Sequence, residues 1–170
     1  MTSIRPAEPR DVPVILQLIH DLAVYEKEPD AVANTEEALR ANLFGEHPAI
    51  FAHVAEDDGG VQGFALWFLN YSTWEGTHGI WLEDLYVRPE ARGKGYGKAL
   101  LQTLAGLAVE RGYRRVEWCV LNWNEPSIRF YESLGARPQD EWTTYRLTGQ
   151  ALAAFGSTQP EPAGQAGATA

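Results

Sequence analysis

The stretch from Arg92 to Lys98 reads R-G-K-G-Y-G-K, with glycines at alternate positions between two basic ends. A glycine-rich turn that opens a helix presents backbone N–H groups to an anion, and the helix dipole favours negative charge there. Strand-like apolar residues precede the turn from Ile80 to Val87, and an amphipathic pattern follows from Lys98 to about Arg111. The stretch therefore predicts a strand, a phosphate cradle and a helix.

Spacing separates this cradle from two other phosphate-binding loops. A Walker loop needs glycine five residues before Gly97 and Ser or Thr after Lys98, but Arg92 and Ala99 stand there. The dinucleotide motif G-x-G-x-x-G fails because its third glycine would fall on Lys98 or Leu100. What fits is R-x-x-G-x-G, which resembles the acyl-CoA pyrophosphate signature of the GCN5-related N-acetyltransferase (GNAT) superfamily. A glycine-rich turn without a ligand is the alternative.

Two adjacent carboxylates, Glu83 and Asp84, lie on the predicted strand just before the cradle. A lysine-like amine has a pKa of about 10.4 and must lose a proton before it attacks a thioester, a task that suits a carboxylate. Consecutive strand residues face opposite sides of a sheet, so one carboxylate faces the amine unless a β-bulge re-aims the pair. By this parity Glu83 shares a face with Trp81, and Asp84 with Leu82. We expect Glu83 to be the base, with Asp84 as the alternative or as a structural carboxylate.

Tyr131 is the candidate acid that protonates the departing thiolate. Asn124 can cap a short helix with Pro126 in its first turn, and Tyr131 follows two turns later on the same face. The residues alone favour a core aromatic at Tyr131 over a catalytic acid.

Within the superfamily, about residues 4 to 150 resemble the diamine (spermidine/spermine) N-acetyltransferases, most specifically in W-N-E-P-S-I-x-F-Y from Trp123 to Tyr131. The resemblance implies acetyl-CoA as donor, a homodimer and Tyr131 as proton donor. It implies donor contacts at Leu85, Tyr86, Val87, Arg92, Gly93, Lys94, Gly95, Tyr96, Gly97, Lys98, Asn124 and Ser127. Acceptor contacts are expected at Tyr25, Glu26, Glu83, Asp84 and Asp140, with Trp74 added for cation–π contact.

The leading hypothesis is an acyltransferase that acetylates a primary amine of a polyamine or diamine. Acidic and aromatic residues suit such a polycation. One alternative acceptor is thialysine or another amino-acid-like or protein amine. A second alternative is an acyl-CoA-binding module without transfer, which would need the cradle but neither Tyr131 nor Glu83.

Composition narrows the remaining function classes. The 170 residues include 14 basic and 23 acidic ones, a net charge of −9 that argues against nucleic acid as a partner and favours cationic small molecules. Cys119 is the single cysteine, and the four histidines are scattered, so no metal is expected. No signal core or run of 18 apolar residues occurs, so we expect a cytoplasmic protein without a membrane partner.

Periodicity predicts an α/β fold with a mixed, partly parallel central sheet flanked by helices, and the resemblance implies that this is the GNAT fold. A single domain is expected over residues 1–155, with a disordered tail at 156–170. Helices are expected to start near Asp11 and Thr35. Strands are expected at 3–6, 50–56, 61–70, 115–121 and 142–147, with a loop at 71–79.

Overall fold

The computed structural model describes residues 3–157, which divide into two compact units, one ending at Glu125 and the other beginning at Pro126. The expectation of one domain over residues 1–155 stays a prediction. Of the predicted tail, Gly156 and Ser157 close a helix, and 158–170 lie outside the described residues.

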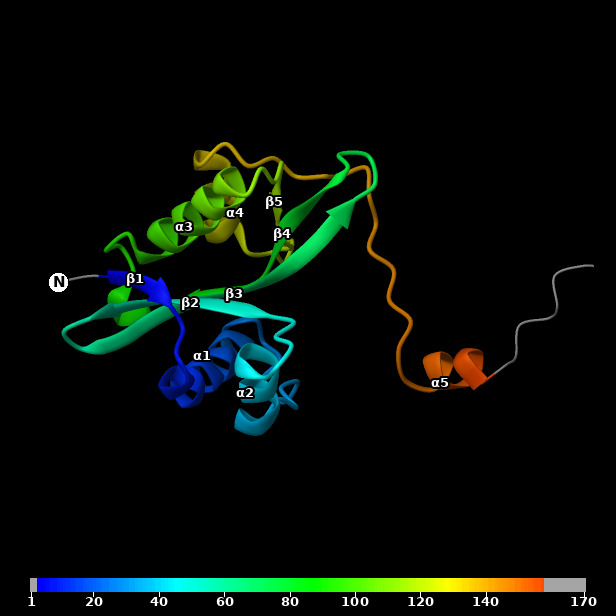
Figure 1. The fold of residues 1–170 in the computed structure, drawn as a ribbon, viewed down its shortest axis with the longest axis horizontal. Helices are drawn as coiled ribbons and strands as arrows, with labels where there is room; N and C mark the ends of the chain where they lie inside the picture. The colour runs from blue at the N-terminus through cyan, green and yellow to red at the C-terminus, as the bar shows by residue number, and fades with distance from the viewer. Residues whose placement is uncertain (1–2, 158–170) are drawn as a thin grey trace, which may run out of the picture. The chain divides into compact units, whose positions relative to one another are not determined.

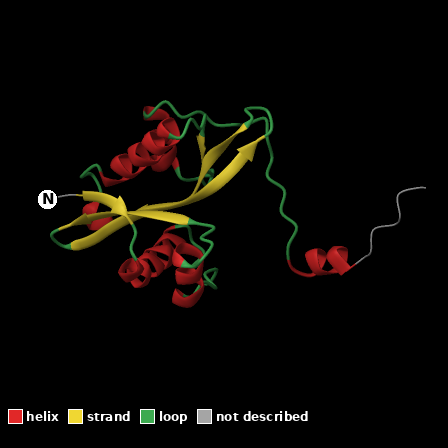
Figure 2. Cartoon of the chain, in the orientation of Figure 1, coloured by secondary structure: helices red, strands yellow, loops and turns green. Residues whose placement is uncertain are grey.

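The first unit is built on one mixed sheet (Figures 1 and 2). Its strands follow sequence order: β1 (Ser3–Pro6), β2 (Phe51–Asp57), β3 (Gly60–Ser72), β4 (Thr77–Val87) and β5 (Val116–Glu117). Neighbouring strands are antiparallel except for β4 and β5, which are parallel. The predicted mixed, partly parallel sheet is therefore confirmed, and the apolar strand β3 is central as its sequence indicated.

Helices cover both faces of this sheet. Figure 1 shows α1 (Val12–Tyr25) and α2 (Glu36–Phe44) on one face and α3 (Tyr96–Glu110) on the other. The α1–α2 face buries a core that includes Ile15, Leu18 and Leu39 against Phe64 and Leu66 of β3. Short 3-10 turns, η1 (Pro9–Asp11) and η2 (Pro89–Ala91), precede α1 and follow β4.

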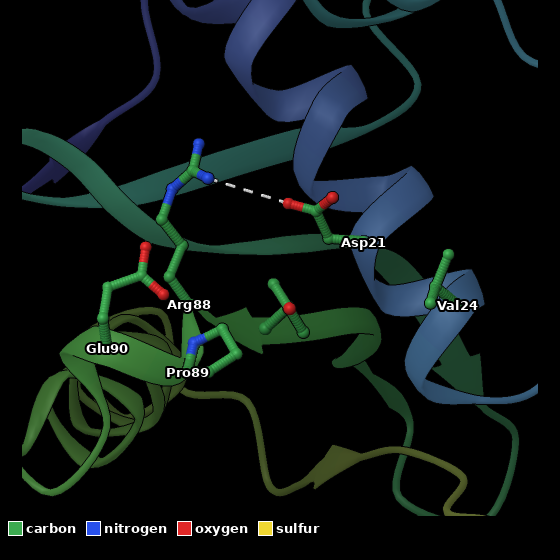
Figure 3. Close-up of a pocket in the computed structure, with 6 residues that line it drawn as sticks. Asp21, Val24, Arg88, Pro89 and Glu90 are labelled. Carbon is green, nitrogen blue, oxygen red and sulfur yellow. Dashed lines mark ion pairs between the residues drawn. The ribbon is translucent and has the colours of Figure 1, made fainter.

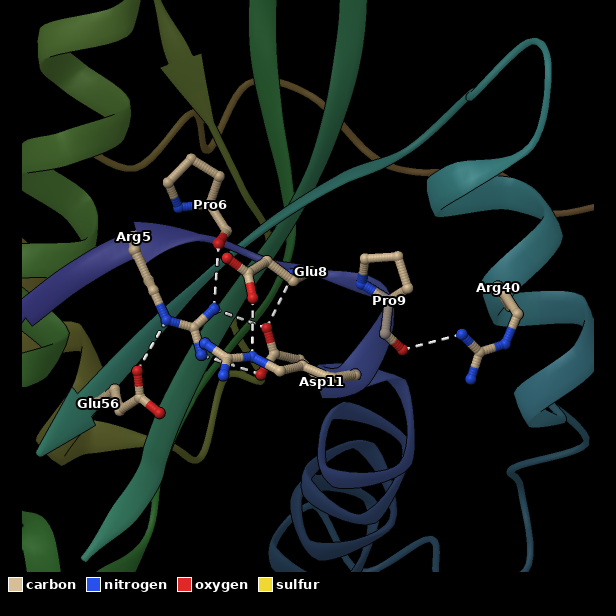
Figure 4. Close-up of polar contacts among 8 residues, drawn as sticks. Arg5, Pro6, Glu8, Pro9, Asp11, Arg40 and Glu56 are labelled. Carbon is tan, nitrogen blue, oxygen red and sulfur yellow. Dashed lines mark hydrogen bonds and ion pairs between the residues drawn. The ribbon is translucent and has the colours of Figure 1, made fainter. Parts of the chain in front are cut away.

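Arg5 of β1 ties the start of α1 to the sheet (Figure 4). Its guanidinium donates to both carboxylate oxygens of Asp11, at 2.7 and 3.0 Å, and to Glu56 of β2 at 2.7 Å. The Asp11 carboxylate also accepts the backbone N–H of Glu8 at 2.8 Å, so it caps η1 rather than α1. Burial alone would raise the pKa of Asp11, but these hydrogen bonds outweigh it and hold that pKa below its usual value.

Three elements predicted from the sequence differ from those in the structure. Tyr71 pairs with His78 and Ser72 with Thr77, so most of the predicted loop at 71–79 is a continuing hairpin, and only a short turn remains. The strand predicted at 115–121 pairs over Val116–Glu117 alone. The strand predicted at 142–147 is wrong, because the described part of the chain offers it no neighbouring strand, and a strand exists only through pairing.

The second unit contains most of α4 (Glu125–Ser133) and all of α5 (Gly149–Ser157). The predicted short helix after Asn124 is confirmed as α4, and Gly135, with φ of 89°, follows its end. Residues 136–148 connect the two helices, mostly without regular structure, and Tyr145 among them is 92% exposed.

Candidate active site

The glycine turn between β4 and α3 needs left-handed backbone that glycine provides without steric cost. Gly93 has φ of 78° and Gly95, the N-cap of α3, has φ of 86°. The helix begins at Tyr96, two residues before the predicted start, because the Tyr96 ring is buried and its hydroxyl donates to Asp57 at 2.8 Å. Tyr96, predicted as a donor contact, thus anchors the helix through its side chain, and its backbone N–H is the group left for a ligand.

The turn is open enough to admit a diphosphate. A Cβ built on Gly93 or Gly95 would meet no atom within 4 Å, so protein atoms do not crowd this side of the backbone. The first hydrogen bond of α3 runs from Ala99 N–H to Gly95 O at 2.9 Å, which leaves the N–H groups of the first turn for an anion. Lys94 and Lys98 are exposed beside them. Backbone donors, dipole and cations fit the pyrophosphate of an acyl-CoA.

Arg92, at the start of the cradle, is held among groups from two other elements. Its Nε donates to the carbonyl of Val87 at 3.1 Å. Its guanidinium carbon lies 5.1 Å from the Tyr25 ring centroid and 5.6 Å from that of Tyr86. Both lie within the range of cation–π attraction. Arg92 therefore joins the cradle to the end of α1, where the predicted acceptor residues begin.

The β5 side of β4 is unpaired next to the cradle. Within the described residues β4 pairs with β5 only at Ile80 and Trp81, whereas β4 continues to Val87. The edge from Leu82 onward therefore presents backbone N–H and C=O groups without a strand partner. Such an edge can hold the amide-rich arm of CoA as a further strand would be held, and Leu85, Tyr86 and Val87 lie on it.

A β-bulge in β4 re-aims the two carboxylates. Leu66 of β3 pairs with Asp84 and its neighbour Trp67 pairs with Leu82, so Glu83 is the extra residue. Because paired residues share a face, Leu82 and Asp84 face opposite sides of the sheet. The simple parity that grouped them does not hold, and Asp84 shares the α1-facing side with Leu66 and Tyr86 of the core.

Asp84 is the carboxyl group with a pKa near neutrality. It is half-buried, and burial raises its pKa to about 7, assisted by the negative charges of Glu83 and Glu26. Glu26, at the end of α1, is also half-buried, and burial raises its pKa. Two acidic neighbours, one from β4 and one from the end of α1, thus act on Asp84, and its carboxyl can exchange a proton near pH 7.

Glu83 occupies a different environment from its neighbour. Its side chain is exposed and accepts a hydrogen bond from the indole Nε1 of Trp81 at 2.9 Å. This contact orients the carboxylate at the surface next to Asp84. Trp81 was not among the predicted site residues, although strand parity had placed it on the same face as Glu83.

The end of α1 positions Tyr25 and Glu26 through a Schellman motif. The N–H of Lys27 donates to Val24 O at 3.1 Å, and that of Glu28 to Ala23 O at 2.9 Å. Lys27 has φ of 66°, and its ammonium lies 4.1 Å from the Trp123 ring centroid.

Tyr25 connects the predicted acceptor side to the predicted donor side. Its hydroxyl donates to Oδ1 of the buried Asn124 at 2.9 Å, and its ring lies 6.1 Å from that of Trp123. The residue before α4 and the end of α1 are thereby held together within the first unit.

A cavity of about 300 Å³ lies at the cradle end of β4 (Figure 3). Asp21 and Val24 of α1 face Tyr86 and the turn from Arg88 to Glu90 across it. Arg88 forms an ion pair with Asp21 at 3.7 Å. The cavity offers both charge signs next to the face on which Asp84 lies, and the sequence contained no motif for it.

Trp74 lies apart from this cluster within the first unit, and three other predicted site residues belong to the second unit. Trp74 is at the tip of the β3–β4 hairpin and is 85% exposed. Thr77, where β4 begins, is seven residues from Asp84, a separation of about 23 Å along a strand. Tyr131, Ser127 and Asp140 belong to the second unit, where Tyr131 lies on α4 with its ring 5.5 Å from that of Phe130.

No metal-binding group of three or more His, Cys, Asp or Glu side chains occurs within residues 3–157. Over the same range, none of the helices has the length and apolar character needed to cross a bilayer.

Known proteins resemble the chain in sequence and in fold. A thialysine N-epsilon-acetyltransferase of Sus scrofa is 39% identical over 160 residues, covering 88% of this chain and 94% of the relative. A spermidine/spermine N(1)-acetyltransferase-like protein of Homo sapiens is 32% identical over 159 residues, covering 88% of this chain and 23% of that protein. The solved structure of an integron cassette protein of V. cholerae superposes with a TM-score of 0.78 at 25% identity, covering 92% of this chain and 98% of the other.

The family described as acetyltransferase (GNAT) matches residues 15–136, which include most of α1, the strands β2 to β5, the cradle and α4. The predicted family, fold and donor are confirmed by this match, and the open cradle fits that donor. The chain belongs to the GNAT family of acetyltransferases and is an acyltransferase that takes its acetyl group from acetyl-CoA.

Proposed function

We propose that the protein acetylates a primary amine of a small acceptor that carries a second charged group, with Asp84 removing the amine proton. The observation that carries the proposal is the half-buried Asp84 carboxyl, whose pKa of about 7 lies where a general base works at neutral pH. The sequence of the strand offered Glu83 and Asp84 for this role. The burial of Asp84 and the surface exposure of Glu83 favour Asp84.

The surrounding charges suit a cationic acceptor. Glu26, Glu83 and Asp84 form an acidic group at the bulge. A bound ammonium would lower the pKa of Asp84, which burial and the charges of Glu83 and Glu26 raise. Asp84 would then be ionised when the substrate arrives and could take the proton directly or through water. Glu83, exposed beside it, would attract the incoming cation.

The donor side rests on the cradle and the open edge of β4. Acetyl-CoA supplies the activated thioester whose acetyl group is transferred. Gly93 to Lys98 would hold its pyrophosphate through backbone N–H groups, and Leu85 to Val87 would pair with the pantetheine arm. Arg92, Lys94 and Lys98 add positive charge at this end.

Tyr131 is proposed as the proton donor to the CoA thiolate, and Ser127 and Asn124 as contacts to the CoA arm. This part rests on the resemblance of residues 123–131 to the diamine acetyltransferases. Asp140 remains a proposed acceptor contact on the same ground. A phenol is a suitable acid for this step because its ordinary pKa of about 10 lies near that of a leaving thiol.

The acceptor class is open to a direct comparison. The thialysine N-epsilon-acetyltransferase of Sus scrofa acts, by its name, on thialysine, which is an amino-acid-like amine. The match with this chain covers 94% of that relative's length. The cavity beside Tyr86 supports the same class, because Arg88 could meet an α-carboxylate while Asp21 or Glu90 meets an α-ammonium. We therefore propose a diamino acid as the acceptor and a polyamine as the second candidate, which the acidic group at the bulge favours.

Steady-state acetylation should be measured for thialysine, ornithine, putrescine, spermidine and a lysine peptide at equal concentrations. The highest kcat/KM is expected for a diamino acid, and Arg88→Gln should lower that value without changing the value for putrescine. Preference for spermidine or putrescine would overturn the diamino-acid assignment and support the polyamine. Binding of acetyl-CoA without turnover of any amine would contradict the acetyltransferase proposal as a whole.

We propose that the protein is a homodimer. The exposed segment that connects α4 to α5 in the second unit supports this proposal. Tyr145 and Leu147 are 92% and 51% exposed in a segment whose alternation predicts a strand. A second copy of the chain could provide the strand partner that the described residues lack. Light scattering coupled to size exclusion should give twice the chain mass, and deletion of residues 141–147 should give the monomer.

A further inference from the structure

A second cavity, of about 260 Å³, lies at the opposite end of α3 from the glycine cradle. Its lining comes from the end of β1, the end of α2, the start of β2, the middle of β3 and the last turn of α3: Pro6, Ala7, Leu43, Phe44, Phe51, Ala52, His53, Trp67, Leu107 and Arg111. Arg111 is 16 residues beyond Gly95, a distance of about 24 Å along a helix. The cavity is therefore separate from the site at which acetyl transfer is proposed.

Aromatic rings contribute to the lining of this cavity. The Trp67 ring, 2% exposed, has its centroid 4.7 Å from that of Phe51 and 6.1 Å from that of His53. The remaining lining is largely aliphatic. A preformed pocket with such walls takes an apolar or aromatic group of modest size.

His53 contributes one polar atom of fixed character. Its Nδ1 accepts a hydrogen bond from the indole Nε1 of Trp67 at 3.2 Å, so the neutral ring carries its hydrogen on Nε2. Burial and the charge of Arg111 lower the pKa of His53, which keeps the ring neutral at pH 7. Nε2 of His53 forms no hydrogen bond with any residue that the structure describes. Among the described residues, every fully buried side-chain nitrogen or oxygen has a hydrogen-bond partner. Nε2 is therefore not fully buried and is accessible as a donor.

Arg111 contributes a cation at the rim. Its guanidinium carbon lies 5.7 Å from the Trp67 centroid, and the side chain is exposed. Its backbone caps the end of α3 through N–H to Leu107 O at 3.0 Å. No carboxylate of residues 3–157 forms an ion pair with this guanidinium, in contrast to Arg114, which pairs with Glu75 at 3.1 Å.

We propose that this cavity binds a small aromatic carboxylate. The aromatic ring would lie against Trp67 and Phe51, and the carboxylate would accept hydrogen bonds from the Arg111 guanidinium and His53 Nε2. A guanidinium binds a carboxylate through two parallel hydrogen bonds. The carboxylate oxygens have further lone pairs, so one of them can also accept a hydrogen bond from His53 Nε2. A cationic ligand is disfavoured because the positive charge of Arg111 at the rim would repel it.

Phenylacetate is a suitable probe, and the indole N–H resonance of Trp67, assigned with Trp67→Phe, is a direct reporter. Titration should shift this resonance saturably, and the shift should persist with saturating CoA. Phenylacetamide, which has the same shape and no charge, should bind at least about 10-fold more weakly. Arg111→Gln should reduce phenylacetate affinity by a similar factor, while Arg114→Gln should leave it unchanged.

The proposal would be overturned by the absence of a saturable shift of the Trp67 resonance, by equal affinity for the amide, or by displacement of the probe by CoA. Arg111 is exposed at the end of α3, so the Arg111→Gln variant should fold. An unchanged acetylation rate would verify that the variant is folded. Unchanged probe affinity in this variant would also count against the site.

Discussion

The hydroxyl of Tyr25, at the end of α1, donates a 2.9 Å hydrogen bond to Oδ1 of Asn124, the residue that precedes α4. The two residues are 99 positions apart in the chain. Tyr25 is a predicted acceptor contact and Asn124 a predicted donor contact. This hydrogen bond therefore fixes the end of α1 against the residue that precedes α4.

Removing the Tyr25 hydroxyl should loosen this relation. Tyr25→Phe removes the hydroxyl that donates to Oδ1 of the buried Asn124, at a cost of about 1 kcal/mol, or roughly a fivefold change in an equilibrium constant. We expect the acceptor KM to rise by a factor of that size, with kcat changing less. Tyr71→Phe, at an exposed position of β3, is the matched control and should change neither constant. Unaltered kinetics in Tyr25→Phe would show that the bond has no role in acceptor binding.

Asp84→Asn should remove the general base. We expect kcat/KM to fall by roughly 10²-fold or more, the usual effect of losing a proton-transfer group. In the wild type, kcat/KM should rise with pH until the Asp84 carboxyl is ionised, at about 7, and this inflection should be absent from Asp84→Asn. The acceptor amine titrates in both proteins, so the difference between the two pH profiles isolates Asp84. Glu83→Gln is the control; a larger loss there than at Asp84 would assign the base to Glu83.

The same substitution should stabilise the fold at neutral pH. The pKa of Asp84 is raised in the folded state from an ordinary value of about 3.9, so the folded state holds the proton more tightly. Its contribution to the free energy of unfolding therefore declines as pH rises from about 4 to 7. Asp84→Asn lacks this term, so its stability relative to the wild type should increase over that window in urea denaturation. A constant difference across the window would contradict the raised pKa.

Gly95→Val should weaken acetyl-CoA binding. The residue has φ of 86°, a backbone conformation that a β-branched side chain avoids, and the added side chain would point into the open cradle. We expect at least a 10-fold rise in the Kd for CoA by calorimetry. Gly106→Ala, inside α3 with no atom within 4 Å of the new Cβ, is the control and should bind CoA normally. Wild-type affinity in Gly95→Val would exclude the turn as the pyrophosphate site.

Tyr131→Phe tests the proposed acid. A phenylalanine keeps the ring on α4 and removes the proton, so kcat should fall by roughly 10²-fold while CoA affinity is kept. Tyr145→Phe in the same unit, at a side chain that is 92% exposed, should be indistinguishable from the wild type. A normal kcat for Tyr131→Phe would remove this residue from the mechanism.

Arg5 should matter for stability and not for chemistry. Arg5→Met leaves the nearly buried Asp11 carboxylate without its bidentate partner, and we expect a loss of about 2 kcal/mol in the free energy of unfolding. Because the pKa of Asp11 is lowered in the folded state, this stability is present at neutral pH and lost as pH falls through that pKa. The gap to the wild type should therefore narrow in acid. Arg10→Gln removes an exposed pair with Glu8 and should cost less than about 1 kcal/mol.

Much of the fold could be predicted because local residue patterns dictate it. The apolar period of α1 and the Thr35 cap of α2, whose hydroxyl accepts Ala38 N–H at 3.1 Å, are properties of consecutive residues. The same holds for the glycine turn, since positive φ at Gly93 and Gly95 depends on residue type more than on neighbours. The family, the donor and the position of the cradle were accessible from the sequence for this reason.

Only the tertiary structure decided which way the carboxylates point and what their charges do. Strand parity predicts alternate faces, but the one-residue bulge opposite Leu66 and Trp67 depends on how β3 pairs with β4, which no local pattern encodes. The raised pKa of Asp84 depends on burial under α1 and on Glu26, far away in the chain. The predicted strand at 142–147 is absent for the same physical reason: alternation gives a segment the ability to pair, and pairing itself needs a neighbour from elsewhere in the fold.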